Sequence, residues 1–412
     1  MGQNNNLVSV SDFKETVDKV VTYISDKATN LQPQYVTYGV QIDTTNSDPG
    51  KACTYIGDCE NHATGWDAWK DDVLFSTIRP CILNNGQVLY YLQRDNMTLK
   101  EDGSTANFTS IGLDTMIEFP KIGYKFETVG DKHNIYITND PDKEGFCYLA
   151  HSLNNIGDCD KIYIGAYLGY VTSNQLYSLA EYQPTASTTL TNFRTYATNR
   201  GSGYQLLSFY PWTLLQCLYL IIYKNLNGQG ALGQGYVGGS AEQKNGLTKI
   251  NTFCYGTMSA TQCMKFLGVE NMWGNLYQWC DGLYCDNNRN ILTYYKNFTA
   301  TDNGDTGYYA STASGYTANF GSYTTNIQGT NDTGFIPKGA ITGASGTTYY
   351  CDYSFVVANR CAAVGSYYSN GDYVGPFCYY IGSSVNQTNV YFGARLIYKH
   401  KTKNEFLTPA PS

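Results

Sequence analysis

The sequence predicts an α+β fold for most of the chain. Short strand-like runs bounded by polar turns recur through its first half, for example at residues 35–42 and 124–129. One long apolar segment, residues 209–223, has the flanks and length of a helix. Residues 226–260 and 299–348 are rich in Gly, Thr, Ser and Asn and have little periodicity. This mixture fits neither an all-β fold nor a helical repeat.

The composition favours a binding surface. Only 15% of the 412 residues are charged, against ~25% in an ordinary soluble domain. Neutral polar residues replace them, with 36 Asn, 43 Thr and 25 Ser, and the chain also contains 39 Tyr. Tyr, Ser, Asn and Gly together supply large amphipathic rings and adaptable hydrogen bonds. The net charge of -7 argues against a nucleic-acid partner, which needs clustered Lys and Arg.

Residues 1–35 are expected to contain an amphipathic helix at residues 11–28. Asp12 and Glu15 have the spacing of a capping box. Two interpretations stay open: docking on the helix's own domain, or a self-associating bundle or anchor to a larger assembly. Residues 1–10 lack the basic start and apolar core of a signal peptide, so export by the standard route is not expected. Apolar side chains recur along the helix at spacings of three and four, at Phe13, Val17, Val20, Val21, Ile24 and Ala28.

Residues 36–105 are expected to form a small β-rich subdomain. Its strands are predicted at residues 35–42, 73–78 and 87–92, separated by turns at 84–86 and 101–103. Further strands are predicted at residues 116–119, 124–129, 134–138 and 161–168.

Residues 209–223 are predicted to form a buried helix that does not insert into a membrane. Ser208 before the segment and Pro211 in its first turn suit a helix start, and residues 225–230 suit a stop. The segment has 15 residues and contains Gln216, whereas a membrane span needs ~20 apolar residues.

The 13 cysteines are expected to be mostly free thiols that pack as small apolar groups. Close pairs occur at Cys53/Cys59 and Cys280/Cys285, but neither has a second pair and a His at zinc spacing. One or two disulfides stay open for an oxidising environment.

Three segments in order carry a family resemblance. Residues 268–283 are GVENMWGNLYQWCDGL, residues 360–382 are RCAAVGSYYSNGDYVGPFCYYIG, and residues 391–398 are YFGARLIY. The order of these segments and the residues in them resemble the motifs of proteins with the formylglycine-generating-enzyme type of C-type lectin fold. The resemblance implies a scaffold motif made by Glu270, Trp273, Gly274, Asn275, Trp279, Gly393 and Arg395. Trp273, Tyr277 and Trp279 would fill the core, and Gly274 and Asn275 would allow a tight turn.

Over roughly residues 36–400 the chain is similar to variable proteins of diversity-generating retroelements, particularly those of bacteriophages. The resemblance implies a C-type-lectin-like ligand-binding domain at residues 106–400, a variable region near residues 359–390 and a tail at 401–412. Several of the tyrosines in this region are expected to be packing residues. The implied ligand-binding residues are Asn359, Tyr367, Tyr368, Asn370, Asp372, Tyr373, Tyr379, Tyr380, Ser383, Ser384 and Asn386.

Enzymatic chemistry has little support, so no activity, metal or cofactor is expected. The formylglycine-generating enzymes hold copper through two closely spaced Cys ahead of an RCAA-like segment, whereas here Cys351 lies ten residues before Cys361. The four His are far apart in sequence and none accompanies a nucleophile and an orienting acid. Glu270 is expected to be a buried hydrogen-bonding group, and Asp281 a turn residue. Residues 286–288 are expected to form a solvated turn.

The composition favours a binding protein, and the resemblance to phage variable proteins implies a phage receptor-binding or host-adhesion protein. Its expected partners are a host-cell surface protein or glycan, other virion proteins, and copies of itself, with a trimer favoured. Residues 1–35 would then serve oligomerisation or virion anchoring. The expected location is the virion surface, on the tail (as in a tail fiber) or the capsid exterior, after synthesis in the bacterial cytoplasm. The alternatives are a structural capsid or tail decoration protein and, third, a formylglycine-generating-type oxidase.

Overall fold

The computed structural model describes residues 14–21, 34–296, 298, 310–339 and 345–401. The chain divides into two compact units, Met1–Tyr35 and Val36–Ser412. Residues 14–21 of the first unit are helical, which confirms that part of the predicted helix, while the rest of it, including Asp12, lies outside the described residues.

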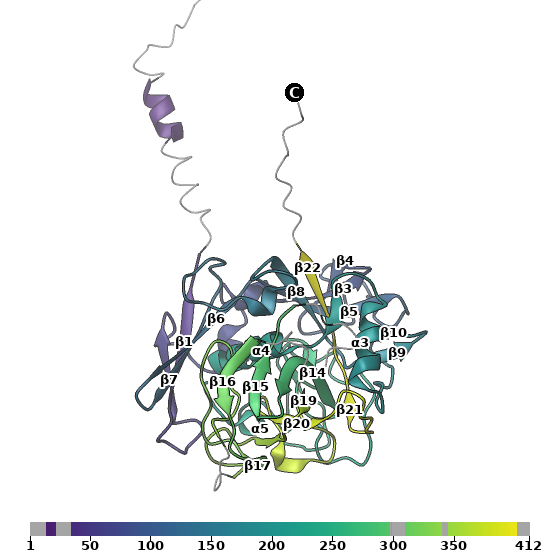
Figure 1. The fold of residues 1–412 in the computed structure, drawn as a ribbon. Coiled ribbons are helices and arrows are strands. Elements are labelled where there is room, and N and C mark those ends of the chain that lie inside the picture. Colours follow the sequence, from purple (N-terminus) through teal and green to yellow (C-terminus); the bar gives the residue numbers. More distant parts are fainter. Residues whose placement is uncertain (1–13, 22–33, 297, 299–309, 340–344, 402–412) are drawn as a thin grey trace, which may run out of the picture. The chain divides into compact units, whose positions relative to one another are not determined.

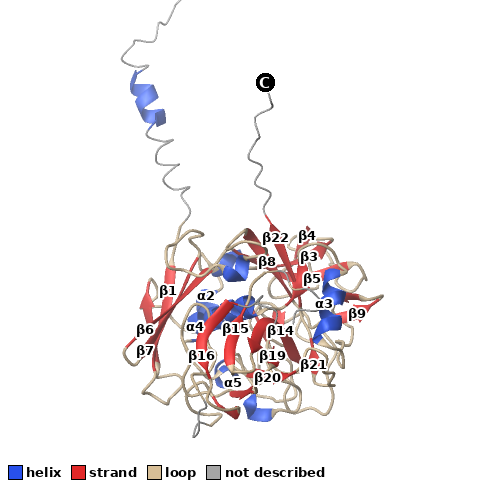
Figure 2. Cartoon of the chain, viewed as in Figure 1, coloured by secondary structure: helices blue, strands red, loops and turns tan. Residues whose placement is uncertain are grey.

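The second unit is a mixed α+β structure in which sheets predominate and helices are few, as predicted (Figure 2). The strands described in this unit form a four-stranded, a six-stranded and an eight-stranded sheet and two small ribbons. The ribbons are made by β9 (Tyr170–Thr172) with β10 (Gln175–Tyr177), and by β12 (Lys265–Phe266) with β13 (Val269–Glu270).

Two of the sheets are antiparallel throughout and combine strands that are distant in sequence (Figure 1). The four-stranded sheet has the order β2-β1-β7-β6, and the six-stranded sheet the order β11-β22-β8-β5-β3-β4. The strands of the first are β1 (Thr37–Asp43), β2 (Cys53–Gly57), β6 (Gly123–Val129) and β7 (Lys132–Thr138). Those of the second are β3 (Arg79–Asn84), β4 (Gln87–Tyr91), β5 (Leu113–Pro120), β8 (Cys159–Gly165), β11 (Tyr204–Leu206) and β22 (Leu396–Lys401).

The eight-stranded sheet is mixed. Its main order is β16-β15-β14-β19-β20-β18-β17, and β21 pairs with β14 outside this order. The pairs β18–β20 and β14–β21 are parallel, and the other pairs are antiparallel. Its strands are β14 (Tyr277–Cys285), β15 (Asn290–Thr293), β16 (Ala310–Gly315), β17 (Phe320–Tyr323), β18 (Tyr353–Val356), β19 (Arg360–Val364), β20 (Tyr379–Ser383) and β21 (Phe392–Gly393).

The longest described helix, α4 (Phe209–Tyr223), lies in the core of the second unit. Its bounds are the predicted ones, and every residue from Phe209 to Ile222 is buried. The helix contacts β1, β6 and β7 of the four-stranded sheet and β14 of the eight-stranded sheet. Its end is marked by Lys224 in a left-handed conformation, with φ 47°. Among the described helices, none combines the length and apolar character of a membrane span.

The other helices of this unit are short. The longest of them is α3 (Leu190–Thr198), whose first turn is capped by the Thr189 side chain. The remainder are α2 (Trp66–Trp69), α5 (Gly228–Ala231) and the 3-10 turns η1 (Phe75–Thr77), η2 (Leu149–His151) and η3 (Gly371–Tyr373).

Most strand predictions for the first half of the chain are confirmed. The turn at Asn85-Gly86 has positive φ at both residues, 47° and 77°, which is the geometry of a two-residue hairpin turn. The strands expected at residues 35–42, 87–92, 116–119, 124–129, 134–138 and 161–168 are observed as β1, β4, β5, β6, β7 and β8.

The strand predicted at residues 73–78 is wrong. The Asp72 carboxylate accepts hydrogen bonds from the backbone N–H of Leu74 (2.9 Å) and Phe75 (3.3 Å), which bends the chain into the turn η1. The apolar pattern of residues 73–78 does not show that the Asp72 side chain binds the backbone N–H groups that a strand would use.

The boundary predicted near residue 105 falls inside the sheets. β1 pairs with β7, and β3 pairs with β5, so strands on both sides of this boundary share hydrogen bonds. Residues 36–105 accordingly belong to the same compact unit as the chain that follows.

The segments rich in Gly and Thr are ordered by packing and contain more structure than predicted. Residues 226–260 hold α5 and are otherwise irregular, fixed by backbone bonds such as Val237 N–H to Ala260 O at 2.8 Å. The described part of the second segment contains β16 and β17, which were not predicted.

All thirteen cysteines are free and buried, as expected for most of them. Burial raises the pKa of Cys53 to about 12 and that of Cys147 to about 11. Protonated thiols of this kind behave as small apolar side chains.

Candidate functional site

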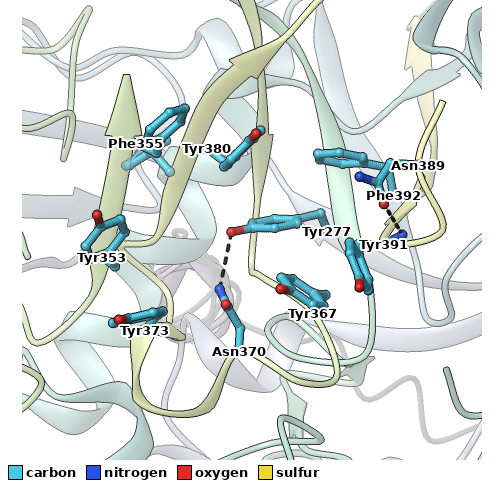
Figure 3. A pocket seen from close by; sticks show the side chains of 11 residues that line it. Tyr277, Tyr353, Phe355, Tyr367, Asn370, Tyr373, Tyr380, Asn389, Tyr391 and Phe392 are labelled. Carbon is cyan, nitrogen blue, oxygen red and sulfur yellow. Dashed lines mark hydrogen bonds between the residues drawn. The ribbon is translucent and has the colours of Figure 1, made fainter. Parts of the chain in front are cut away.

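A pocket lined by aromatic rings lies on the eight-stranded sheet and encloses about 340 Å³ (Figure 3). Nine of its lining residues are aromatic, and the other two are Asn. We call this site the aromatic pocket. Its lining residues are Tyr277, Tyr353, Phe355, Tyr367, Asn370, Tyr373, Tyr379, Tyr380, Asn389, Tyr391 and Phe392.

The register of the sheet brings rings from separate strands together. Phe355 of β18 is the partner of Tyr380 of β20, and their rings stack at 5.2 Å with an interplanar angle of 17°. Tyr380 is in turn the partner of Ala363 of β19, whose small side chain leaves room on this face. Tyr277 of β14 is the partner of Phe392 of β21, and these rings stack at 5.3 Å. Strand pairing therefore positions the rings without help from a ligand.

Two glycines make room for this arrangement. A Cβ atom on Gly382 would lie 2.8 Å from both the Phe355 and the Tyr380 rings. A Cβ atom on Gly321 would lie 2.5 Å from the Tyr353 hydroxyl. Any larger residue at either position would displace the rings.

The loop between β19 and β20 supplies Tyr367, Asn370 and Tyr373. Its backbone is tied to neighbouring loops, because Tyr368 N–H donates to Asn275 O at 3.0 Å and Gly371 N–H donates to Val237 O at 3.1 Å. The loop is thus held at points on both sides of Asn370, and its pocket-facing side chains are preorganised.

A polar contact lies at the base of the pocket. Asn370 Nδ2 donates to Ser366 Oγ at 2.6 Å and to the Tyr277 hydroxyl at 3.4 Å (Figure 3). Burial raises the pKa of Tyr277 well above its usual value, so this hydroxyl keeps its proton.

The predicted scaffold motif meets the pocket lining at Trp279, whose ring stacks on that of Phe392 at 4.9 Å. Trp273 and Trp279 are fully buried, and Trp273 Nε1 donates to Gly233 O at 3.1 Å. Gly274 and Asn275 form the bend between them, with φ of 79° and 65°. The Asn275 side chain accepts from Gln243 N–H (2.8 Å) and donates to Gln243 O (3.0 Å).

Arg395 is the hub of this scaffold. It is fully buried, and its guanidinium donates to Gln278 Oε1 (2.6 Å), Gly165 O (2.8 Å) and Glu270 O (2.7 Å). These partners belong to β14, β8 and β13, so one cation joins two sheets and a ribbon. Burial lowers the pKa of Arg395 to about 9, opposed by the nearby Glu270 carboxylate. Gly393 of β21, two residues before Arg395, is also buried.

Glu270 is a buried hydrogen-bonding group, as predicted. Its carboxylate accepts from Gly246 N–H (2.7 Å), Thr248 N–H (2.6 Å) and the Thr248 hydroxyl (2.7 Å). Burial raises its pKa, and these hydrogen bonds oppose the shift.

The prediction that Asp281 is a turn residue is wrong. Asp281 lies inside β14, is 1% exposed and forms an ion pair with Arg194 of α3, with Nε to Oδ2 at 2.9 Å. A buried carboxylate needs such a partner, and Arg194 lies too far away in sequence for the pair to be visible there.

Five of the eleven residues predicted to bind ligand line the aromatic pocket: Tyr367, Asn370, Tyr373, Tyr379 and Tyr380. Tyr373 is 40% exposed, and Tyr367, Asn370 and Tyr380 are half-buried. Tyr379 is fully buried, and its hydroxyl donates to Gln216 Oε1 of α4 at 3.0 Å.

The other six predicted residues lie outside the lining. Tyr368 and Ser383 are buried, at 7% and 0% exposure. Asn359 accepts a hydrogen bond from the Tyr284 hydroxyl, and Asp372 is exposed beside Tyr373 and hydrogen-bonds to Tyr323. The remaining two, Ser384 and Asn386, are exposed.

Six lining residues were not among those predicted to bind ligand. Tyr353 and Phe355 are two residues apart on β18, so both face the pocket. This alternation was a usable signal in the sequence. Tyr277 had been assigned to the core, and only the pairing of β14 with β21 brings it to the pocket floor. The other three are Asn389, Tyr391 and Phe392.

Among the residues that the structure describes, no cluster of side chains is assembled for a metal-dependent or His-centred reaction. No group of three or more His, Cys, Asp or Glu there could hold a metal ion. His62 stacks on Trp69 at 3.7 Å, and His133 lies between Thr128 and Asn326 with both ring nitrogens 2.9 Å from an oxygen. Residues 286–288 form the turn between β14 and β15, as predicted.

No family model and no curated protein matches the chain. Among solved structures, the Major Tropism Determinant U1 and M1 variants are each 11% identical to it, with a TM-score of 0.31 and coverage of 77% of this chain and 78% of theirs. The P3c variant of the same protein is 13% identical, with a TM-score of 0.30 and the same coverage. These identities and scores are too low to assign a fold or a function to this chain.

Proposed function

We propose that this chain is a host-adhesion protein of a bacteriophage, which binds a receptor on the host-cell surface through the aromatic pocket. The observation that carries the proposal is the convergence of nine rings, from four strands and two loops, on one partly exposed site. Buried aromatic side chains normally fill a core, whereas here the rings of Tyr367, Tyr373 and Tyr380 remain accessible. The phage origin rests on the resemblance of residues 36–400 to retroelement variable proteins.

The construction of the pocket suits recognition rather than catalysis. Tyr offers a large contact area with few torsions to immobilise and carries a hydroxyl for hydrogen bonding. Strands and a tied loop hold the rings in place, so little ordering entropy is lost on binding. Weak binding at each pocket would gain strength from several copies on one virion, provided that the copies reach the same cell.

A pair of double variants tests this function. Tyr367→Ala/Tyr380→Ala removes two accessible pocket rings, and Tyr170→Ala/Tyr182→Ala is the matched control, because it removes a stacked tyrosine pair outside the pocket. Whole-cell binding across candidate hosts should fall at least tenfold for the first variant, since central aromatic anchors contribute ~2 kcal/mol or more. The control should bind like wild type. Equal host attachment by both variants, with both folded by circular dichroism, would favour the structural decoration protein instead.

We propose further that the loop and β20 residues of the pocket wall belong to a diversified region. A template repeat of the codons for residues 360–400, next to a reverse-transcriptase gene in the surrounding DNA, is the expected observation. Related copies with identical residues 367–386 and no such repeat would rule out diversification without affecting the adhesion proposal.

A further inference from the structure

We propose that the ligand of the aromatic pocket is a neutral saccharide that lays the face of a pyranose ring against the tyrosine and phenylalanine rings. This inference deepens the proposed adhesion function and rests on it. It comes from the shape of the ring surface, from the unpaired polar atoms at its edges, and from the charges around it.

The rings form a continuous surface. Each ring contacts the next in the order Phe355, Tyr380, Tyr277, Tyr367 and Tyr391. The distances between successive ring centroids are 5.2, 5.3, 5.4 and 4.1 Å. Figure 3 shows Tyr277 at the centre of this surface, with Tyr353 and Tyr373 to its left, Tyr391 to its right and Tyr367 below it. Such a surface matches a flat ligand with apolar faces, and the C–H groups of a pyranose make such a face. The volume of about 340 Å³ lies within the ~300–1,000 Å³ of small-molecule pockets.

Polar atoms that have no partner among the described residues lie around the rings. The structure gives no hydrogen-bond partner, among the residues it describes, to the hydroxyls of Tyr367, Tyr373 and Tyr380. At the base, Asn370 Nδ2 donates to Ser366 Oγ, so the side-chain carbonyl oxygen of Asn370 is left to accept a hydrogen bond from a ligand. The Asn389 Oδ1 atom is used by Tyr391 N–H at 2.9 Å, which leaves its Nδ2 group to donate.

These atoms favour a sugar over an apolar peptide side chain. An aliphatic or aromatic side chain seated on the rings would cover the hydroxyls and amides without replacing their water, and each polar group left unsatisfied would weaken binding. A pyranose carries hydroxyls around its rim and apolar faces above and below, so it satisfies both parts of the lining together.

The charges disfavour an anionic ligand. None of the described lining residues is charged, so the pocket offers no Lys or Arg to a carboxylate or a phosphate. The nearest charges in sequence are negative: Asp352, which is buried, precedes Tyr353, and Asp372, which is exposed, precedes Tyr373. The chain as a whole carries a net charge of -7. The structure therefore points to neutral hexoses or deoxyhexoses rather than uronic or sialic acids.

The test uses three single variants of the full chain and immobilised oligosaccharides. The probes are neutral oligomers of glucose, galactose, mannose, rhamnose and N-acetylglucosamine, beside acidic oligomers of glucuronic, galacturonic and sialic acid. Phe355→Ala removes a stacking face, Tyr380→Phe keeps the ring but removes a hydroxyl, and Tyr170→Ala is the control outside the pocket.

Wild type should bind at least one neutral oligomer and none of the acidic ones. Phe355→Ala should weaken that binding at least tenfold, Tyr380→Phe should weaken it about threefold or more, and Tyr170→Ala should leave it unchanged. Unchanged or tighter binding by Tyr380→Phe would overturn the inference, because a purely apolar ligand gains nothing from the hydroxyl. Preference for acidic oligomers would overturn it as well.

Treatment of host cells separates this inference from the adhesion function. Periodate cleaves vicinal diols of surface sugars, and proteinase removes surface proteins. Pocket-dependent attachment that periodate abolishes supports the saccharide. Attachment that survives periodate but not proteinase refutes the saccharide and leaves the adhesion proposal intact. Attachment that is insensitive to Tyr367→Ala/Tyr380→Ala refutes the adhesion proposal itself.

Discussion

At the scale of single residues, Arg395 holds several elements of the scaffold together through hydrogen bonds. Carbonyl groups from β8 and β13 and the side chain of Gln278 all point to its guanidinium. A carbonyl group at the end of a strand has no hydrogen-bond partner within the sheet. When such a group is buried away from water, losing its hydrogen-bond donor costs free energy. Arg395 satisfies several such groups together because its five N–H donors diverge in a plane.

Replacing Arg395 by Met should therefore lower the free energy of unfolding by about 3 kcal/mol or more, because several buried acceptors lose their donor together. Urea unfolding followed by tryptophan fluorescence measures the change. Arg360→Ala is the control, since Arg360 is only partly buried and donates to the carbonyl of its neighbour Asn359. That substitution should change the stability by no more than ~0.5 kcal/mol. A similar loss in both variants would mean that Arg395 has no special role.

His151 predicts a dependence of stability on acid pH. The side chain is fully buried, Nε2 accepts from Ile122 N–H at 3.2 Å, and burial lowers its pKa to about 3. Below its ordinary pKa the unfolded chain takes up a proton that the folded chain does not, so stability is lost as the pH falls from about 6.5 towards 3.

The variant His151→Gln keeps an acceptor and cannot titrate. Its stability should fall less steeply with acid than that of wild type, by up to ~1.4 kcal/mol per pH unit between pH 6 and 4. Urea unfolding at several pH values compares the two slopes, and equal slopes would show that His151 titrates normally.

The sequence predicts individual roles well where a residue's chemistry limits its surroundings. Glu270 is an example: a carboxylate within an apolar motif must find hydrogen bonds, and it does. The tyrosines of the wall are harder to predict, because Tyr suits both a core and a surface. Tyr379 and Tyr380 are identical in type, yet one is fully buried and the other lies half-exposed in the pocket.

At the scale of elements, α4 is coupled to the pocket through Gln216. Gln216 Nε2 donates to Pro376 O (2.7 Å), in the segment before β20, and Oε1 accepts from the Tyr379 hydroxyl (3.0 Å). The buried helix thereby supports the strand that carries Tyr380.

A double-mutant cycle measures this support. Gln216→Leu leaves the Pro376 carbonyl and the Tyr379 hydroxyl unpaired, and Tyr379→Phe leaves Gln216 Oε1 unpaired. The double variant should therefore lose less stability than the sum of the two, with a coupling of ~1 kcal/mol. The control cycle combines Gln216→Leu with Tyr210→Phe, because the Tyr210 hydroxyl bonds Thr293 and shares no partner with Gln216. The control should be additive, and additivity in both cycles would remove the coupling.

Elements with strong local signals were predictable. The apolar length of residues 209–223 with Ser208 and Pro211 at the start identifies α4, and the Asn85-Gly86 dipeptide identifies a hairpin. β16 and β17 lie in Gly- and Thr-rich chain with little alternation, and they become strands through their neighbours β15 and β18. Context of this kind is not present in a local stretch of sequence.

At the scale of the whole molecule, pairing between distant segments produces the site. The six-stranded sheet joins β3 and β4 to β22, which is more than 300 residues later in the chain. The fold class follows from local patterns, but this order of strands does not, because no short-range signal encodes which strands pair. The aromatic pocket depends on such pairings and was only partly predictable for that reason.

The division of the chain at residues 35 and 36 leads to a test of the first unit. Removal of residues 1–33 should leave the melting temperature and the binding of a single pocket unchanged, and should reduce the mass in light scattering to that of a monomer. This outcome is expected if the helix self-associates. A lower melting temperature with an unchanged mass would show instead that the helix docks on its own domain.

Neighbouring positions along β20 differ sharply in how much change they should tolerate. A library that randomises positions 367, 370, 373 and 380 alters three partly exposed tyrosines and the half-buried Asn370, and it should retain folded members, since the fully buried residues of the sheet are untouched. A library that also randomises Tyr379 and Ser383 alters fully buried positions and should consist mostly of misfolded chains. New specificities should therefore be obtained by alternating fixed and varied codons rather than by varying the segment as a block.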